Sequence, residues 1–196
     1  GIMALPSLEI CRGVEIQFAT NHLGHFELLS SLIENLAGAA ESRVAIVSSA
    51  AHRQAPAAGI EFDNLDGSRG YSGFRAYGQS KLANVLFANE LNRRTPDHVK
   101  VNSLHPGIIQ TNLGRHMQGP FAVLLGMFLF PFMSSIPQGA ATSCFVVANP
   151  QAAEITGRYF ADCRPAKVNP LADDENLARR LWETSEALIG REQGVA

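Results

Sequence analysis

The chain has 196 residues, of which 46% are hydrophobic and 17% are charged, and its net charge is −2 at pH 7. These values fit a soluble α/β protein of one domain and exclude a disordered chain. Because the charge is balanced and no segment is rich in Lys and Arg, we expect no nucleic-acid partner. The three cysteines are widely spaced, which predicts free thiols in a reducing compartment such as the cytoplasm.

Hydrophobic periodicity and breaker residues divide the chain into alternating helices and strands. Apolar residues recur at helical spacing over residues 14–36, 75–92, 139–148 and 173–188. Short β-branched or alternating runs predict strands over residues 43–49, 99–104 and 157–160. Between the first strand and the second helix, residues 50–73 predict a long loop of the kind that usually has a function. The alternation predicts an α/β fold with helices on both faces of a parallel sheet.

The most apolar stretch, "PFAVLLGMFLFPFM", begins at Pro120 and ends at Met133. It is shorter than the roughly 20 apolar residues that a membrane-spanning helix needs, and Pro131 interrupts it. We therefore expect it to form a lid or one wall of an apolar substrate pocket. Shallow contact with a membrane surface is the alternative.

Tyr77 and Lys81 lie one turn apart on one face of the helix predicted over residues 75–92. Asn84 shares that face. An ammonium group beside a phenol lowers the pKa of the phenol and makes it a proton donor and acceptor near neutral pH. Ser49 ends the first predicted strand, and α/β proteins bind ligands at the carboxyl-terminal ends of their parallel strands. Together these residues predict a site where a tyrosine exchanges a proton with an oxygen held by a serine.

Other kinds of site fit the sequence less well. A tyrosine and a lysine four residues apart are common on helices, so the pair alone is a weak signal. Leu82 occupies the second glycine position of a G-x-S-x-G turn, which argues against a serine hydrolase. His22 and His25 could share a helix face as metal ligands, but no third ligand has suitable spacing, so we expect packed or hydrogen-bonded histidines and no metal. The histidines expected on the surface or in loops are His52, His98 and His116.

Five segments occur in a fixed order: "NHLGHF", "VAIVSSAAH", "AYGQSKLAN", "VNSLHPGIIQTNL" and "GRYFADC…ARRLWETSEALIG". Together they resemble the short-chain dehydrogenase/reductase family, and within it the retinol-dehydrogenase-like branch, which includes the WW-domain-containing oxidoreductases. The resemblance covers essentially all 196 residues. It implies the C-terminal two-thirds of a Rossmann-type, doubly wound parallel sheet with helices on both faces.

The resemblance implies a catalytic tetrad of Asn21, Ser49, Tyr77 and Lys81. In the family, the tyrosine exchanges a proton with the alcohol or carbonyl oxygen, and the serine orients that oxygen. The lysine lowers the pKa of the tyrosine and hydrogen-bonds the nicotinamide ribose. The asparagine supports a water that links the lysine to solvent. Ser48 is the neighbouring candidate for the serine role, and the motif favours Ser49.

The same resemblance implies a nicotinamide cofactor, with NADP favoured and NAD as the alternative. Tyr77 and Lys81 are expected to contact it, and the turn after the second predicted strand is expected to hold its carboxamide group. The residues of that turn are Pro106, Gly107, Ile109 and Thr111. The implied substrate is a small apolar alcohol or carbonyl compound of retinoid, steroid or lipid-aldehyde type.

One family motif is absent from the sequence, namely the glycine-rich turn T-G-x-x-x-G-x-G that binds the dinucleotide phosphates. The opening "GIMALP" resembles the final glycine of the family's N-N-A-G motif together with the next residues of the family pattern. We therefore expect residues 1–196 to form a single partial domain without the phosphate-binding half. An exposed hydrophobic edge beside the first strand is the expected consequence.

Two hypotheses for the whole chain remain open. The first is an oxidoreductase; the alternative is a catalytically silent fragment or interaction module that binds no cofactor by itself. The helices near Asn21 and Tyr77 are apolar nearly all round, so they need cover on more than one side. A second copy in a homo-oligomer or the absent half would supply that cover.

Overall fold

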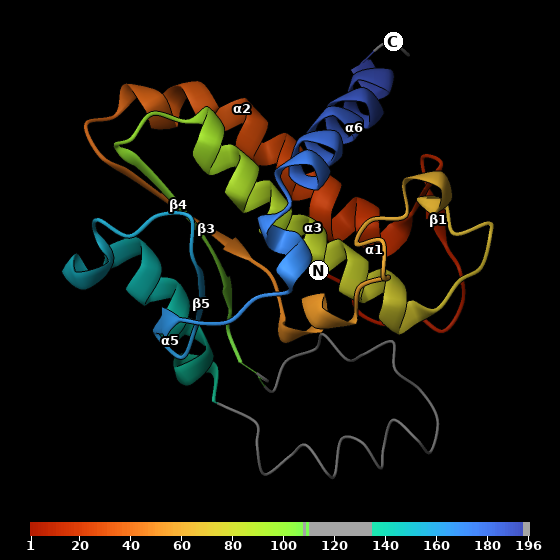
Figure 1. Cartoon of the computed structure of the whole chain (residues 1–196), viewed down its shortest axis with the longest axis horizontal. Coiled ribbons are helices and arrows are strands. Elements are labelled where there is room, and N and C mark those ends of the chain that lie inside the picture. The colour runs from red at the N-terminus through yellow and green to blue at the C-terminus, as the bar shows by residue number, and fades with distance from the viewer. Residues whose placement is uncertain (108, 110–134, 194–196) are drawn as a thin grey trace.

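The computed structural model describes residues 1–107, 109 and 135–193. Helices and strands alternate around one four-stranded sheet, as Figure 1 shows. The strands of this sheet are β3 (Ser42–Val47), β4 (Val99–His105), β5 (Tyr159–Ala161) and β6 (Arg164–Pro165). The longer helices are α2 (Gly24–Gly38), α3 (Gly73–Arg94), α5 (Ile136–Ala148) and α6 (Glu175–Gln193). The α/β class that the sequence predicts is confirmed.

The sheet has the strand order β3-β4-β5-β6, and its first three strands are parallel. The register of β3 and β4 begins with Ser42 opposite Val99. β6 departs from the parallel pattern because it forms a tight hairpin with β5, in which Asp162 and Cys163 adopt φ values of 49° and 58°. Among the described residues β3 pairs with β4 alone, so it forms an edge of the sheet, and Val47 on it is 46% exposed.

Helices cover both faces of this sheet (Figure 1). Val44 and Ile46 of β3 pack in the layer formed with α2, α3 and α6. Ala45 lies in the smaller cluster with residues of α5. A strand directs successive side chains to opposite faces, so β3 takes part in both layers. The doubly covered sheet expected from the alternation of elements is therefore confirmed.

Helix α3 runs through the centre of the molecule, and its side chains are buried from Tyr77 to Ala88. It contacts β3, β4, α6 and the 3₁₀ turn that follows β3. Leu82, Leu86 and Leu91 on it are 0% exposed. A helix that is apolar nearly all round needs such cover on several sides. Elements of the same chain provide it here, so a second copy is not needed to bury α3.

The first helix begins later than the sequence predicts and contains a π turn. Val14–Glu15, where the predicted helix begins, pairs with Ile10–Cys11 in the hairpin β1–β2, and α1 (Ile16–Phe18) follows it. The Glu15 carboxylate accepts a hydrogen bond from the last backbone N–H of α1 and so caps this helix. A π turn over Ala19–Leu23 then leads into α2. Apolar spacing does not reveal the inserted residue of a π turn, which explains the difference.

The long loop between β3 and α3 is organised by 3₁₀ turns at Ala50–Gln54 and Phe62–Asn64. Gln17, which is 0% exposed, ties this loop to the amino-terminal segment. Its side-chain amide donates to the Tyr71 hydroxyl at 3.1 Å and accepts from the Ala4 N–H at 2.7 Å. Two further 3₁₀ turns precede β5 and α6, at Pro150–Ala152 and Pro170–Asp173.

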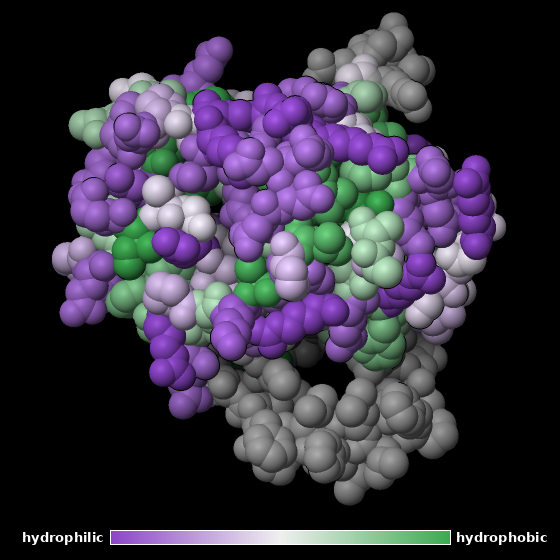
Figure 2. Space-filling view, in the orientation of Figure 1, coloured by the Kyte–Doolittle hydropathy of each residue, from purple (hydrophilic) through white to green (hydrophobic). Residues whose placement is uncertain are grey.

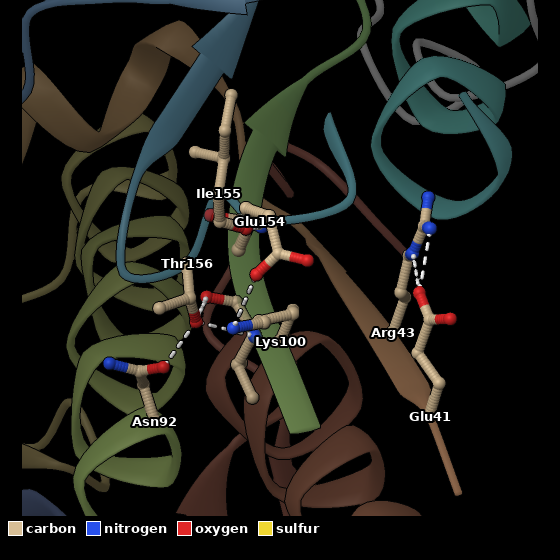
Figure 3. A network of polar contacts seen from close by, with 9 residues as sticks. Glu41, Arg43, Asn92, Lys100, Glu154, Ile155 and Thr156 are labelled. Atoms are coloured by element: carbon tan, nitrogen blue, oxygen red, sulfur yellow. Dashed lines mark hydrogen bonds and ion pairs between the residues drawn. The ribbon is translucent and has the colours of Figure 1, made fainter. Parts of the chain in front are cut away.

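A network of polar contacts joins the amino-terminal ends of the strands to α3 (Figure 3). The Thr156 hydroxyl accepts a hydrogen bond from the Val101 N–H at 2.9 Å and donates to the Asn92 side chain of α3. Lys100 of β4 forms an ion pair with Glu154 at 3.3 Å. This end of the sheet therefore has a structural role, and the residues expected to be catalytic lie at the opposite end.

Hydrophilic side chains predominate on the face shown in Figure 2, with smaller hydrophobic areas between them. Exposed large apolar side chains occur on several elements; they are Ile10, Leu28, Leu32, Val47, Phe74, Ile136 and Val147. Within the part of the chain that the structure describes, no helix is long and apolar enough to cross a membrane. The apolar segment of residues 120–133 lies outside the described residues, so its expected role stays a prediction.

Replacing Leu86 with alanine tests the weight of α3 in the core. Because the Leu86 side chain is 0% exposed, Leu86→Ala should lower the free energy of unfolding by about 2–5 kcal/mol. Leu28→Ala is the matched control, because Leu28 is also helical but 58% exposed. This substitution should lower the free energy of unfolding by about 0.5 kcal/mol or less. Urea unfolding followed by circular dichroism measures both changes. Equal losses would contradict a central role for α3.

Candidate active site

The carboxyl-terminal ends of β3 and β4 lie beside the first half of α3, and the π turn packs against the same helix. Open α/β sheets bind ligands at this end of their strands. The structure brings to this place the four residues expected to form the tetrad: Asn21 from the π turn, Ser49 after β3, and Tyr77 and Lys81 from α3.

Tyr77 is 4% exposed and forms a hydrogen bond with the Ser49 side chain. Burial raises the pKa of Tyr77 above its ordinary value, and the hydrogen bond with Ser49 lowers it in part. The sequence predicts a lowered pKa, and for this structure that prediction is wrong. The reason is positional: Lys81 Nζ lies over the phenol ring, 5.7 Å from its centroid, while burial disfavours the phenolate.

Lys81 is 7% exposed, and burial lowers its pKa to about 8. Its Nζ atom approaches the carbonyl oxygen of Val47, the last residue of β3, at 3.5 Å. Gly1 also lies nearby, since a Cβ atom added to it would be 4.0 Å from Nζ. A lysine with this pKa exists in both protonated and neutral forms in mildly alkaline solution, so it is suited to give and take a proton.

Ser48 and Ser49 have different surroundings. Ser48 is 2% exposed, and its hydroxyl donates to the backbone carbonyl oxygen of Lys81 at 2.7 Å. The Ser49 hydroxyl accepts from the Ala51 N–H at 3.2 Å and hydrogen-bonds Tyr77. The geometry therefore favours Ser49 over Ser48 as the serine that acts beside Tyr77.

Every polar side-chain atom of Asn21 has a partner within the chain. Its Nδ2 donates to the Ile2 carbonyl oxygen at 2.9 Å and to Ser80 Oγ at 3.1 Å, and its Oδ1 accepts from the Ile2 N–H at 2.9 Å. The backbone carbonyl oxygen of Asn21 accepts a hydrogen bond from Asn84 Nδ2 at 2.9 Å. It also forms a hydrogen bond with His25 Nδ1 at 2.7 Å. Asn21 thus joins the amino-terminal segment to α3. The water that the resemblance places beside it stays a prediction.

The turn expected to hold the nicotinamide carboxamide follows β4 at the same end of the sheet. Pro106, Gly107 and Ile109 are described, whereas Thr111 lies outside the described residues. Gly107 has a φ of 90°, a conformation that favours glycine and lets the chain turn sharply after the strand. Ile109 lies against Gly139 at the start of α5. The turn therefore lies at the same end of the sheet as the tetrad, and its role stays a prediction.

Sequence reasoning identifies the position of Asn84 but no role for it. In the structure Asn84 Nδ2 also donates to the carbonyl oxygen of Val47, at 3.1 Å. Ser80 donates to the carbonyl oxygen of Tyr77 at 2.8 Å while it accepts from Asn21. The sequence signal for Asn84 was its position on the same helix face as Tyr77 and Lys81. For Ser80, no sequence signal exists, because its partner comes from a distant turn.

His52 corrects another expectation, because it is buried and not at the surface. It lies in the 3₁₀ turn after Ser49, is 0% exposed, and its Nδ1 contacts the Ser49 carbonyl oxygen at 2.6 Å. Its ring packs against Tyr159 with centroids 4.8 Å apart. Burial lowers the pKa of His52, so the neutral ring is favoured. A position just after a strand end gives no sequence signal for this burial.

His22 lies behind Asn21 in the π turn and is 0% exposed. It is hydrogen-bonded to Ser185 at 2.9 Å and contacts Asn84 at 3.4 Å. Burial lowers the pKa of His22 to about 3. The packed, hydrogen-bonded histidine that the sequence predicts is confirmed. Across residues 1–107, 109 and 135–193, no group of three or more His, Cys, Asp or Glu side chains could hold a metal ion.

Comparison with known proteins connects this geometry to a family. Human retinol dehydrogenase 14 is 41% identical over 193 residues, a match that covers 97% of this chain. The chloroplastic short-chain dehydrogenase TIC 32 A of Brassica napus is 42% identical over 197 residues and covers 96% of this chain. Over almost its whole length the chain is therefore similar to proteins named as short-chain dehydrogenases and retinol dehydrogenases. The family resemblance drawn from the five sequence segments is thereby confirmed.

A solved structure has a similar fold. An uncharacterised protein from Mycobacterium paratuberculosis superposes on the chain with a TM-score of 0.63 and is 29% identical, covering 96% of this chain and 63% of that one. No family model matches the chain. The chain spans 56% of the length of human retinol dehydrogenase 14 and 61% of that of TIC 32 A.

The stability of the fold in acid should depend on His22. An ordinary histidine has a pKa of 6.5, whereas that of His22 is about 3 in the fold. The unfolded chain therefore binds a proton that the folded chain does not, so stability is lost as the pH falls from 6.5 towards 3. Between pH 6.5 and 4 the wild type should lose about 3 kcal/mol more than His22→Gln. Urea unfolding at each pH measures this, and parallel profiles would contradict it.

Proposed function

We propose that the protein containing this chain is an NAD(P)-dependent oxidoreductase that interconverts an alcohol and a carbonyl compound. The observation that supports this most is the meeting of Tyr77, Ser49 and Lys81 at the carboxyl-terminal ends of parallel strands. Tyr77 is hydrogen-bonded to Ser49, and Lys81 lies over the Tyr77 ring. The family of the chain, with relatives named as dehydrogenases, supports the same class of reaction.

Each residue has a role in the proposal that its surroundings explain. Tyr77, whose raised pKa keeps it protonated, donates its proton to a carbonyl oxygen in the reduction and takes it back in the oxidation. The Ser49 hydroxyl holds the same oxygen and stabilises the charge that develops on it. Lys81, with a pKa of about 8, exchanges the proton that Tyr77 loses. Asn21 fixes the backbone around the lysine.

The described residues fit a nicotinamide cofactor in part. When bound, the cofactor supplies or accepts the hydride. Lys81 and Tyr77 would hold its ribose, and the turn at Pro106 and Gly107 would hold its carboxamide, since both groups lie at the same end of the sheet. We propose NADP over NAD on the branch resemblance. Without a glycine-rich phosphate-binding turn, these 196 residues by themselves should bind NADPH only weakly.

For the substrate we propose a small apolar alcohol or aldehyde of retinoid, steroid or lipid type. Some relatives are named retinol dehydrogenases, including human retinol dehydrogenase 13, which is 40% identical over 198 residues. The loop of residues 50–73 borders Tyr77, because Gly78 packs against the backbone at Ala51 and Gln54. Side chains of this loop therefore lie where they can limit substrate size.

A kinetic comparison of wild type and Tyr77→Phe tests the proposed function. Removing the phenol hydroxyl removes the proton donor, so kcat should fall by about 10²–10⁴-fold. Cofactor affinity should stay within a few-fold, because Lys81 and the turn at Pro106 and Gly107 still hold the cofactor. The protein expressed from the complete reading frame is assayed by nicotinamide absorbance with retinal, a steroid ketone and a simple aldehyde, and NADPH binding is measured by calorimetry.

Tyr71→Phe is the matched control, because Tyr71 is also hydrogen-bonded but lies in the loop before α3, where its hydroxyl donates to the Leu5 carbonyl oxygen at 3.0 Å. This variant should keep its activity if the protein is folded. Binding of NADPH without turnover of any of the substrates would count against an oxidoreductase. Absence of both binding and turnover would favour the interaction module.

A further inference from the structure

The turn that follows β3 holds the Ser49 hydroxyl through a backbone group. In this turn the Ala51 N–H donates a hydrogen bond to Ser49 Oγ at 3.2 Å. A hydroxyl group has one hydrogen to donate and two positions at which it accepts. The bond from Ala51 therefore leaves the hydrogen and one acceptor position for Tyr77 and a substrate oxygen. The direction of the hydroxyl group depends on where the Ala51 N–H lies.

The chain immediately before Ser49 is fixed from two sides. The Ser48 N–H donates to the Leu104 carbonyl oxygen of β4 at 2.7 Å, and the Ser48 hydroxyl donates to the Lys81 carbonyl oxygen of α3 at 2.7 Å. The rotation that remains is the one about the Cα–C bond of Ser49, where ψ is 158°. This rotation turns the peptide group that follows Ser49, and with it the position of the Ala51 N–H relative to Oγ.

His52 fixes that peptide group with two hydrogen bonds to the carbonyl oxygen of Ser49. The backbone N–H of His52 donates to this oxygen at 3.1 Å, and ring atom Nδ1 lies 2.6 Å from it. Because a carbonyl oxygen only accepts, Nδ1 must carry the proton of the neutral ring. Both acceptor positions of the oxygen are then filled by donors of one residue. The peptide group cannot rotate without breaking both bonds.

The surroundings of the ring keep His52 neutral and in this tautomer. The ring is 0% exposed and packs against Tyr159 of β5, with centroids 4.8 Å apart. Burial lowers the pKa of His52, and Arg53 and His105 lower it further, against the opposing effect of the bond with Ser49. Among the described residues Nε2 has no hydrogen-bond partner. A single proton is therefore more stable on Nδ1, where an acceptor is present.

We propose that His52 is a positioning residue whose Nδ1–H group holds the peptide group after Ser49 and so keeps the Ser49 hydroxyl directed at Tyr77 and the substrate oxygen. The inference rests on the proposed function and deepens it, because it adds a residue outside the tetrad. The turn lies directly against α3, since a Cβ atom added to Gly78 would be 2.8 Å from the backbone carbon of Gln54. A displaced turn would therefore change how Ser49 meets Tyr77.

Two substitutions of His52 separate the hydrogen bond from the packing of the ring. His52→Asn keeps a donor, because asparagine Nδ2 takes the place of Nδ1, but it removes the ring. His52→Phe keeps a ring against Tyr159 but removes the donor. In the protein expressed from the complete reading frame, His52→Phe should lower kcat by about 10–100-fold and change the KM for NADPH by less than about threefold. His52→Asn should keep kcat within about threefold of the wild type.

A purely structural role for His52 predicts the reverse order, with His52→Asn impaired and His52→Phe active, and that order would overturn the proposal. If His52→Phe fails to fold, His52→Gln replaces it, because glutamine has no donor at the position of Nδ1 and should show the same loss of kcat. The matched control is His98→Phe. His98 Nε2 contacts the Ala37 carbonyl oxygen at 3.0 Å, beside the amino-terminal end of β4, so this variant should keep its activity.

Two NMR measurements test the proposal without turnover. The ¹⁵N shifts of His52 at pH 7 should show the Nδ1–H tautomer, with the signal identified by its absence from His52→Asn. Amide hydrogen exchange at Ala51 should be about tenfold faster in His52→Phe than in the wild type, and nearly unchanged in His52→Asn. An Nε2–H tautomer, or equal exchange at Ala51 in all three proteins, would overturn the proposal. If the wild type shows no turnover, the proposed function fails, and these measurements still decide the role of His52 in holding Ser49.

Discussion

The burial of polar side chains on α3 is the constraint on which the rest of the site depends. Tyr77, Ser80, Lys81 and Asn84 lie on a helix with buried leucines on its other sides, and none of the four is more than 7% exposed. Polar groups at such positions need partners, because leaving one unpaired costs on the order of 1–3 kcal/mol. Their partners come from the end of β3, the π turn and Ser49, so satisfying this helix assembles the site.

The same burial determines the charge state of the proposed catalytic groups. It raises the pKa of Tyr77 and lowers that of Lys81 to about 8, so the charged form of each group is disfavoured relative to an exposed side chain, although Lys81 is still mostly protonated at neutral pH. Simple proximity of a lysine to a tyrosine predicts the opposite shift for the phenol. A protonated phenol beside a readily deprotonated amine is suited to donate to a carbonyl oxygen and then to recover its proton. The hydrogen bond with Ser49 lowers the pKa of Tyr77 and so partly offsets the effect of burial.

Much of the fold could be predicted from the sequence, because apolar spacing reports which side of an element is covered. The strands β3, β4 and β5 and the helices α3, α5 and α6 lie where their patterns indicate. Three features could not be predicted from the sequence: the π turn, the β1–β2 hairpin and the burial of His52. Each of them depends on contacts with distant segments. Within the site, Ser49, Tyr77 and Lys81 could be named from motifs, whereas Ser80 and His22 act through partners such as Ser185 that no local pattern reveals.

The sequence by itself indicated the α/β alternation, the family resemblance and the four residues of the expected tetrad. These depend on residue types at short spacing, which the chain contains whether or not it is folded. Only the tertiary structure decided which serine meets Tyr77, how the pKa values shift, and that Asn84 bridges the end of β3 and the π turn. The physical reason is that hydrogen bonds and desolvation depend on distance and burial, and both arise only when segments far apart in the sequence pack together.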